Sequence, residues 1–154
     1  MTELAPPPQR VGRPRAGADV LGAIAAGGTL GATARYALAR VLPPASGHVP
    51  WATLAANVSG SFVLGFLLVV IAERFPPTRL LRPFLATGVI GAYTTMSTFL
   101  VDTTVLVQHG HLLTATAYAG VTLGAGLILA YLGVVSGRSL ARQRGRTDQH
   151  REAR

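Results

Sequence analysis

Residues 83–101 read PFLATGVIGAYTTMSTFLV, a stretch that has no formal charge and whose centre is interrupted by glycines and hydroxyl side chains. A helix needs about 20 mainly apolar residues to cross the hydrocarbon core of a bilayer, so this stretch and its flanks can span one. Non-helical backbone at that depth is tolerated only where it is buried in protein or lines a wet cavity. We therefore interpret the stretch either as a span broken near its middle, or as an intact helix whose hydroxyls bond back to the carbonyl four residues earlier.

The rest of the chain has the same character on both sides of this stretch. Charged residues make up 13% of the chain and hydrophobic residues 49%, with a mean hydropathy of +0.41, whereas soluble domains carry roughly 25% charged residues. The sequence therefore predicts an all-α integral membrane protein with four transmembrane helices, the third broken mid-membrane. The expected spans are residues 20–42, 51–72, 80–106 and 112–135.

The remaining segments are expected to be tails. We place the membrane domain at residues 19–137, between an N-terminal tail over residues 1–18 and an Arg-rich C-terminal tail over residues 138–154. Both tails are rich in proline or arginine, and we expect them to be disordered.

The arginines predict how the chain is oriented. With four spans, both termini and the turn between the second and third spans lie on one side, and twelve of the fourteen arginines lie there. Because positively charged residues stay on the cytoplasmic side, we expect both termini to lie in the cytoplasm, with the chain in the cell membrane. Topology and anionic lipid then explain the +8 net charge better than nucleic acid does.

Several function classes are excluded or weakened. The chain has no cysteine, which excludes disulfides, thiolate metal sites and cysteine nucleophiles. No Asp, Glu, Lys or His lies near the middle of an expected span, which weakens a proton-coupled transporter. No base is placed to activate Ser97, so an intramembrane enzyme is poorly supported. A neutral path lined by hydroxyls and amides suits a channel.

Two polar residues within the spans have alternative interpretations. Asn57 lies near the middle of the second span, where it either makes an interhelical hydrogen bond or donates to an anion. Arg35 lies near a span end, where it can reach the interface with its guanidinium. Small residues repeat at helical spacing in three of the spans, which favours close packing of the bundle.

Three motifs resemble a known family, the Fluc/CrcB fluoride channels. Residues 27–36, GGTLGATARY, resemble the GGxxGAxxRY opening of that family. Residues 53–62, TLAANVSGSF, resemble its TLxxNxxGSF second helix, and residues 91–99, GAYTTMSTF, resemble its third-helix break, GGxTTFSTF. The motifs occur in family order and at family spacing.

The resemblance implies a passive fluoride exporter that works as an antiparallel dimer in the lipid bilayer of the cell membrane. It also implies a structural, non-transported Na⁺ at the dimer centre, bound by the backbone carbonyls of Gly91 and Thr94. By position, Arg35 has a structural role at the interface. The residues implied along the fluoride path are Asn57, Met96, Ser97, Thr98, Phe99, Tyr118 and Thr122.

The chain departs from the family pattern in three ways. Met96 stands where the first pore phenylalanine is expected, and Ala92 replaces the second glycine of the break. The arginine bias favours one fixed orientation, so we hypothesise that the antiparallel partner is a homologous inverted subunit, with a second copy of this chain as the alternative. The alternative function is a non-conducting structural subunit of a heterodimeric channel. A small multidrug transporter is disfavoured, because the first span lacks the membrane-embedded acid that such a transporter needs.

Overall fold

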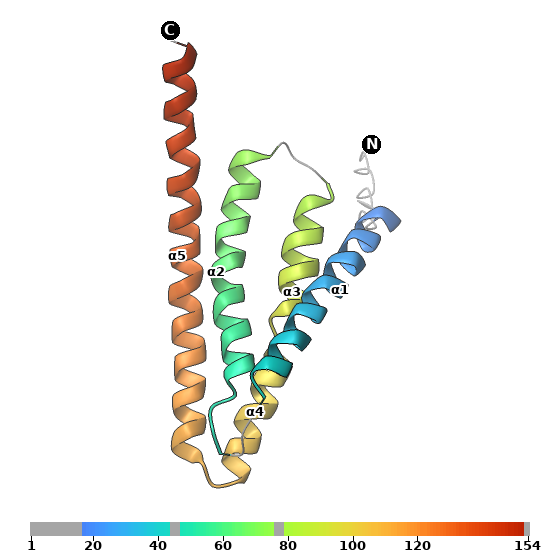
Figure 1. Cartoon of the computed structure of the whole chain (residues 1–154), viewed down its shortest axis with the longest axis vertical. Helices are drawn as coiled ribbons and strands as arrows, with labels where there is room; N and C mark the ends of the chain where they lie inside the picture. The colour runs from blue at the N-terminus through green and yellow to red at the C-terminus, as the bar shows by residue number, and fades with distance from the viewer. Residues whose placement is uncertain (1–16, 44–46, 76–78, 153–154) are drawn as a thin grey trace, which may run out of the picture.

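The computed structural model describes the backbone of residues 17–43, 47–75 and 79–152, and the side chains of these residues up to 142. Over these residues every regular element is helical (Figure 1). The elements in chain order are α1 Ala18–Val41, α2 Trp51–Arg74, the π-helix η1 Pro83–Ile90, α3 Gly91–Tyr93, α4 Met96–Gln108 and α5 Leu112–Glu152. The segment from η1 to α4 forms one rod, so the described chain consists of four rods.

Three of these rods are long and apolar enough to cross a membrane. They are Trp51–Arg74, Pro83–Gln108 and Leu112–Arg142, with mean hydropathies of 2.2, 1.4 and 1.8. Helix α1 has 24 residues, which is about 36 Å at 1.5 Å per residue, but its composition includes Asp19, Arg35 and Arg40 and it does not reach the same hydropathy. Large apolar side chains are exposed on all four rods, as at Leu30, Trp51 and Leu100. Such a surface is typical of a protein surrounded by lipid.

Helix α5 is longer than the expected fourth span over residues 112–135. Helix α5 continues past residue 135 to Glu152, so the C-terminal segment that we expected to be disordered from Arg138 is helical. Arginine, leucine, alanine and glutamine are good helix formers, and no proline interrupts them there. The side chain of Arg74 also donates to the carbonyl of Leu140, which holds this part of α5 against α2. The N-terminal tail lies outside the described residues, apart from its last two positions.

The rods pack as two close pairs, α1 with η1 and α3, and α2 with α5 (Figure 1). In the first pair, a Cβ at Gly31 would overlap the carbonyl oxygen of Val89. In the second, a Cβ at Gly133 would overlap the carbonyl oxygen of Phe62. At these positions only glycine allows the backbones to approach so closely, which confirms close packing for part of the glycine pattern. Gly28 is different, because a Cβ there would meet nothing within 4 Å.

Two extended residues separate α3 from α4. Thr94 has φ −81° and ψ 158°, and Thr95 has φ −151° and ψ 123°. The Thr95 side chain caps α4 by accepting from the backbone N–H of Thr98 at 3.2 Å. Below this point α4 packs against the start of α5 through the buried side chains of Phe99 and Tyr118, whose ring centroids are 5.4 Å apart. The extended pair therefore lies between two well-packed helical regions.

Candidate functional site

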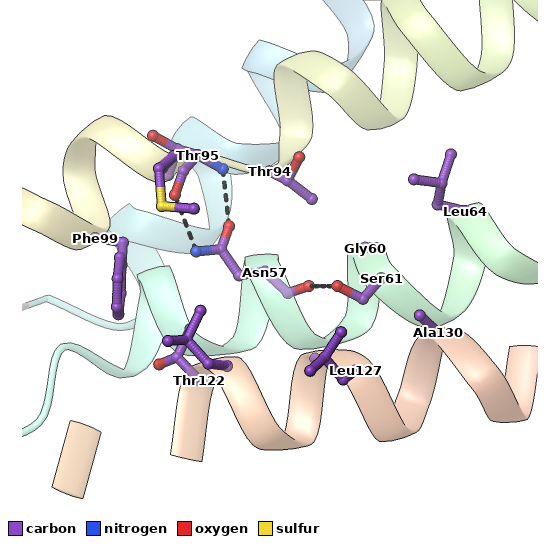
Figure 2. A pocket seen from close by; sticks show the side chains of 13 residues that line it. Asn57, Gly60, Ser61, Leu64, Thr94, Thr95, Phe99, Thr122, Leu127 and Ala130 are labelled. Carbon is purple, nitrogen blue, oxygen red and sulfur yellow. Dashed lines mark hydrogen bonds between the residues drawn. The ribbon is translucent and has the colours of Figure 1, made fainter. Parts of the chain in front are cut away.

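Asn57 of α2 holds the backbone of the extended pair. Its Nδ2 donates to the carbonyl oxygen of Thr95 at 2.9 Å, and its Oδ1 accepts from the Thr95 N–H at 2.8 Å (Figure 2). A side-chain amide can pair with both the N–H and the C=O of one residue only when both groups point toward it, as they do in extended backbone. Of the two alternatives for Asn57, the structure shows a hydrogen bond to another rod, and one Nδ2 hydrogen remains for a further acceptor.

These bonds free two backbone carbonyls. In a continuous helix, the Thr95 N–H would donate to the carbonyl of Gly91 and the Thr98 N–H to that of Thr94. Here the Thr95 N–H donates to Asn57, and the Thr98 N–H donates to the Thr95 hydroxyl. The carbonyls of Gly91 and Thr94 therefore lose their helical donors and can accept from another source.

A cavity of about 330 Å³ opens beside the extended pair, between α2, α5 and the start of α4 (Figure 2). Its lining is mainly apolar, with a few hydroxyls and one side-chain amide. It includes Asn57, Ser61, Leu64, Thr94, Thr95, Met96, Phe99, Thr122 and Leu127. None of the lining residues carries a formal charge, so an ion inside the cavity would meet dipoles alone.

Three of the four hydroxyls that line this cavity donate to the carbonyl four residues earlier, and the fourth, that of Thr95, donates to the Thr98 hydroxyl at 3.0 Å. Ser61 donates to the carbonyl of Asn57 at 2.8 Å, Thr94 to that of Ile90 at 3.0 Å, and Thr122 to that of Tyr118 at 2.7 Å. Each hydroxyl presents its oxygen to the cavity unless it rotates, and exchanging one such bond for another has a small net free energy. The remaining Nδ2 hydrogen of Asn57 is therefore the donor that is free without rearrangement.

The two candidate residues of α4 that line the first cavity differ in their surroundings. Phe99 is buried against Tyr118, whereas Met96 is 62% exposed. Both side chains line the cavity. Because Phe99 is buried and Met96 is exposed, packing holds the ring of Phe99 in place while the thioether of Met96 is free to move. Only Phe99 can offer the positive edge of an aromatic ring.

A polar cluster that the sequence analysis missed lies behind Phe99. The hydroxyl of Thr53 donates to Oδ2 of Asp102 at 2.7 Å, and the hydroxyl of Tyr118 donates to the same atom at 3.5 Å. Thr53 is 8% and Tyr118 1% exposed. Asp102 is the single acid between residues 83 and 137, and an ionisable group within an apolar helix is a signal of function that should have singled it out.

A second cavity, of about 340 Å³, lies on the other side of the extended pair, against α1. Arg35 and Thr98 line it, as does Thr95, which lines both cavities. The Nε of Arg35 is buried and has no hydrogen-bond partner among the residues that the structure describes. Arg35 therefore brings a positive charge to this cavity, and it forms no ion pair with a carboxylate in the described part of the chain.

The predicted site residues separate into groups. Asn57, Thr94, Met96, Phe99 and Thr122 line the first cavity. Arg35 and Thr98 line the second, Tyr118 lies in the cluster with Asp102, and Gly91 and Ser97 are exposed outside both cavities. Within the described part of the chain no three His, Asp or Glu side chains come together.

Comparisons with known proteins identify relatives of the whole membrane domain. Residues 22–134 match the family described as CrcB-like protein, Camphor Resistance (CrcB). The chain is 46% identical over 143 residues to the fluoride-specific ion channel FluC 3 of Streptomyces avermitilis, covering 92% of this chain and 70% of that protein. It is 44% identical over 124 residues to fluoride-specific ion channel FluC 2 of Nocardia farcinica (80% and 85%), and 41% over 130 residues to FluC 1 of Streptomyces coelicolor (84% of each).

Proposed function

The chain belongs to the CrcB-like family of fluoride-specific ion channels, and from this premise we propose that it lets cytoplasmic fluoride leave the cell passively. It is a channel and not an enzyme. The observation that carries the proposal is the uncharged cavity beside Asn57, with one amide hydrogen free to donate. Passive efflux of this kind lowers the toxicity of fluoride that enters as the neutral acid.

The physical requirement on such a path is strict. Fluoride is small and holds its water tightly, so a pore must supply close donors in place of the lost hydration shell. In the uncharged cavity the Asn57 amide, the Thr122 hydroxyl and the ring edge of Phe99 are suited to this. The hydroxyls of Ser97 and Thr98 lie outside that cavity and would act elsewhere along the path. Because the lining has no fixed positive charge, fluoride is attracted without being held so firmly that it cannot leave.

Rotation of hydroxyls completes the path in our proposal. Thr122 bonds to the carbonyl of Tyr118 in the absence of an anion, and an anion that enters the cavity can attract that hydrogen at a net free energy of about 1 kcal/mol. Tyr118 donates to Asp102, and so does Thr53. These two hydroxyls are therefore occupied by a carboxylate and become available to fluoride only when it competes with that carboxylate.

Arg35 lies close to this path without being part of its lining. Its charge gives the second cavity a positive potential, and a focused positive potential raises the local concentration of anions. We propose that this cavity gathers fluoride near Thr95 and Thr98, whereas the uncharged cavity conducts it.

The freed carbonyls fit a hard cation. Na⁺ takes oxygen ligands, and the carbonyls of Gly91 and Thr94 have lost their helical donors. Two oxygens are too few for such an ion, so a second subunit must supply the same pair. We therefore propose a structural, non-transported Na⁺ between two antiparallel subunits of a dimer. In this arrangement Na⁺ would offset the repulsion between the partial negative charges of four carbonyl oxygens that point toward one another.

The proposed topology places both termini in the cytoplasm and α1 across the membrane as a fourth span. The arginine distribution supports this orientation, and the close packing of α1 against η1 supports a membrane position for α1. The alternative of a non-conducting structural subunit gains no support, since the cavity stays open beside Met96.

The test is fluoride efflux from liposomes that contain the purified chain alone, recorded with a fluoride electrode. We expect fast efflux of fluoride and none of chloride. Efflux of chloride at a similar rate would refute selectivity. If crosslinking detects dimeric protein in the vesicles but no fluoride efflux is recorded, conduction by this chain is refuted and the alternative of a structural subunit is favoured.

A further inference from the structure

Arginines gather at one end of the rods. Arg74 ends α2, Arg79 and Arg82 precede η1, and Arg138 and Arg142 lie on α5 at the same level, because Arg74 contacts Leu140. In Figure 1 this is the upper end, where α1 also begins. Among the residues whose side chains are described, the acids at this end are Asp19 and Glu73. The opposite end has a single exposed arginine in a last helical turn, Arg40.

Arg138 and Arg142, the two arginines of α5 whose side chains the structure describes, form no ion pair with another described residue. Among the residues whose side chains are described, one ion pair is present, between Arg79 and Asp19 at 3.7 Å. Arg138 and Arg142 are both exposed and are separated by four residues, so their guanidinium groups extend from one face of α5. This face turns away from α2, since Gly137, the residue that packs on Val69 and Phe66, precedes Arg138 by about 100° of helix rotation.

An apolar stripe leads along α5 to this arginine pair. Ile128, Tyr131 and Val135 are exposed, the last two by 67% and 43%. Together with Arg138 and Arg142 they are spaced by three or four residues and lie on one face of the helix. Val135 is the last exposed apolar residue of this stripe, and Arg138 follows it by about one helical turn. The stripe therefore changes from apolar to cationic at the level where acyl chains meet phosphate groups in a bilayer.

We propose that this face of α5 binds an anionic phospholipid, whose phosphate contacts Arg138 and Arg142 while an acyl chain lies along Tyr131 and Val135. Two adjacent guanidiniums are well suited to a phosphate group. The Arg74 contact with Leu140 holds α5 at a constant height beside α2 and so positions the pair. Lipid of this charge would anchor the long helix at the membrane surface.

A lipid fits this face better than a second copy of the chain. An antiparallel copy would bring its opposite end to the arginine pair, and the described residues of that end offer Arg40 but no exposed acid. A soluble anion would have no use for the apolar stripe. The inference requires only that α5 spans the membrane, and it is independent of fluoride conduction.

The experiment measures lipid retention by native mass spectrometry on the purified full chain. The protein is offered equal amounts of phosphatidylglycerol and phosphatidylcholine in detergent. We expect phosphatidylglycerol to be retained about tenfold better, and Arg142→Gln or Arg138→Gln to lower that preference about fivefold each. Arg40→Gln is the matched control, because it removes one exposed arginine at the other end, and it should leave the preference unchanged.

Three outcomes would overturn the proposal. The first is equal retention of the two lipids by the unsubstituted chain. The second is an equal effect of Arg40→Gln and Arg142→Gln, which would mean a non-specific charge effect. The third is displacement of phosphatidylglycerol by excess inorganic phosphate, which would mean that the site takes a soluble anion. Thermal unfolding gives a second readout: phosphatidylglycerol should raise the midpoint of the unsubstituted chain but not that of the Arg138→Gln/Arg142→Gln variant. Fluoride efflux measured separately distinguishes failure of the channel proposal from failure of this one.

Discussion

Replacing Asn57 by aspartate tests whether electrostatics or backbone geometry governs the cavity. The carboxylate of Asn57→Asp can still accept from the Thr95 N–H, which Asn57 Oδ1 now does at 2.8 Å. It can no longer donate to the Thr95 carbonyl, which accepts from Nδ2 at 2.9 Å. The variant therefore keeps half of the contact that holds the extended pair, and it adds a negative charge to a cavity that has none.

The size of the effect follows from Coulomb's law. A carboxylate and a fluoride about 4 Å apart repel each other by about 4 kcal/mol at an effective dielectric constant of 20. A barrier higher by that amount slows conduction about a thousandfold. Asn57→Ala differs, because it adds no charge but leaves the N–H and the carbonyl of Thr95 unpaired, which destabilises the fold by about 1–3 kcal/mol for each group.

The assay is fluoride efflux per dimer from liposomes, combined with thermal unfolding in detergent. We expect Asn57→Asp to reduce efflux far more than stability, and Asn57→Ala to reduce stability more than Asn57→Asp does. Thr33→Val is the control, because Thr33 is exposed on α1 and bonds only to the carbonyl of Thr29. Efflux by Asn57→Asp within tenfold of the unsubstituted chain would refute the assignment of the cavity to the fluoride path.

Four further outcomes are expected. Gly31→Ala should lower the free energy of unfolding by about 1–3 kcal/mol because its Cβ would overlap the backbone of η1, whereas Gly28→Ala, with open space around it, should be neutral or stabilising; equal unfolding midpoints in detergent would contradict this packing. Thr53→Val should cost about 1–3 kcal/mol, since Asp102 would keep only the 3.5 Å contact, and an unchanged midpoint would argue against the cluster. Met96→Phe should leave stability within about 0.5 kcal/mol, as the side chain is exposed, but raise fluoride efflux severalfold by adding a ring edge; identical efflux would remove Met96 from the path. Replacing Na⁺ by N-methylglucamine throughout purification should lower the unfolding midpoint and the dimer fraction measured by crosslinking, and no change in either would contradict a structural Na⁺.

Much of the fold could be predicted because hydropathy is a local property. The apolar run that begins at Trp51 predicted a span over residues 51–72, and the helix is Trp51–Arg74. Proline and glycine marked the ends of the helices before α2 and after α4. The cost of a polar side chain in an apolar helix likewise singled out Asn57 without any knowledge of its partner. Composition was misleading at the end of α5, where richness in arginine was taken for disorder although the backbone is helical to Glu152.

The site depended on contacts between distant parts of the chain. Asn57 and Thr95 are 38 residues apart, and Thr53 and Asp102 are 49 apart. The packing of α2 and α5 around α4 decides which hydroxyls reach the Asp102 carboxylate. No local sequence pattern encodes the relative height and rotation of these helices. Thr95 was therefore recognised as part of a break, but its position between two cavities was not.

The sequence by itself determined that this chain is a helical membrane protein with an uncharged polar segment in its third rod, because those properties depend on residue type and spacing. Only the tertiary structure decided that Asn57 takes over both backbone groups of Thr95, that the carbonyls of Gly91 and Thr94 lose their helical donors, and that Asp102 lies against two hydroxyls. Hydrogen bonds are short and directional, so they exist only once packing has brought the helices to a fixed height and rotation.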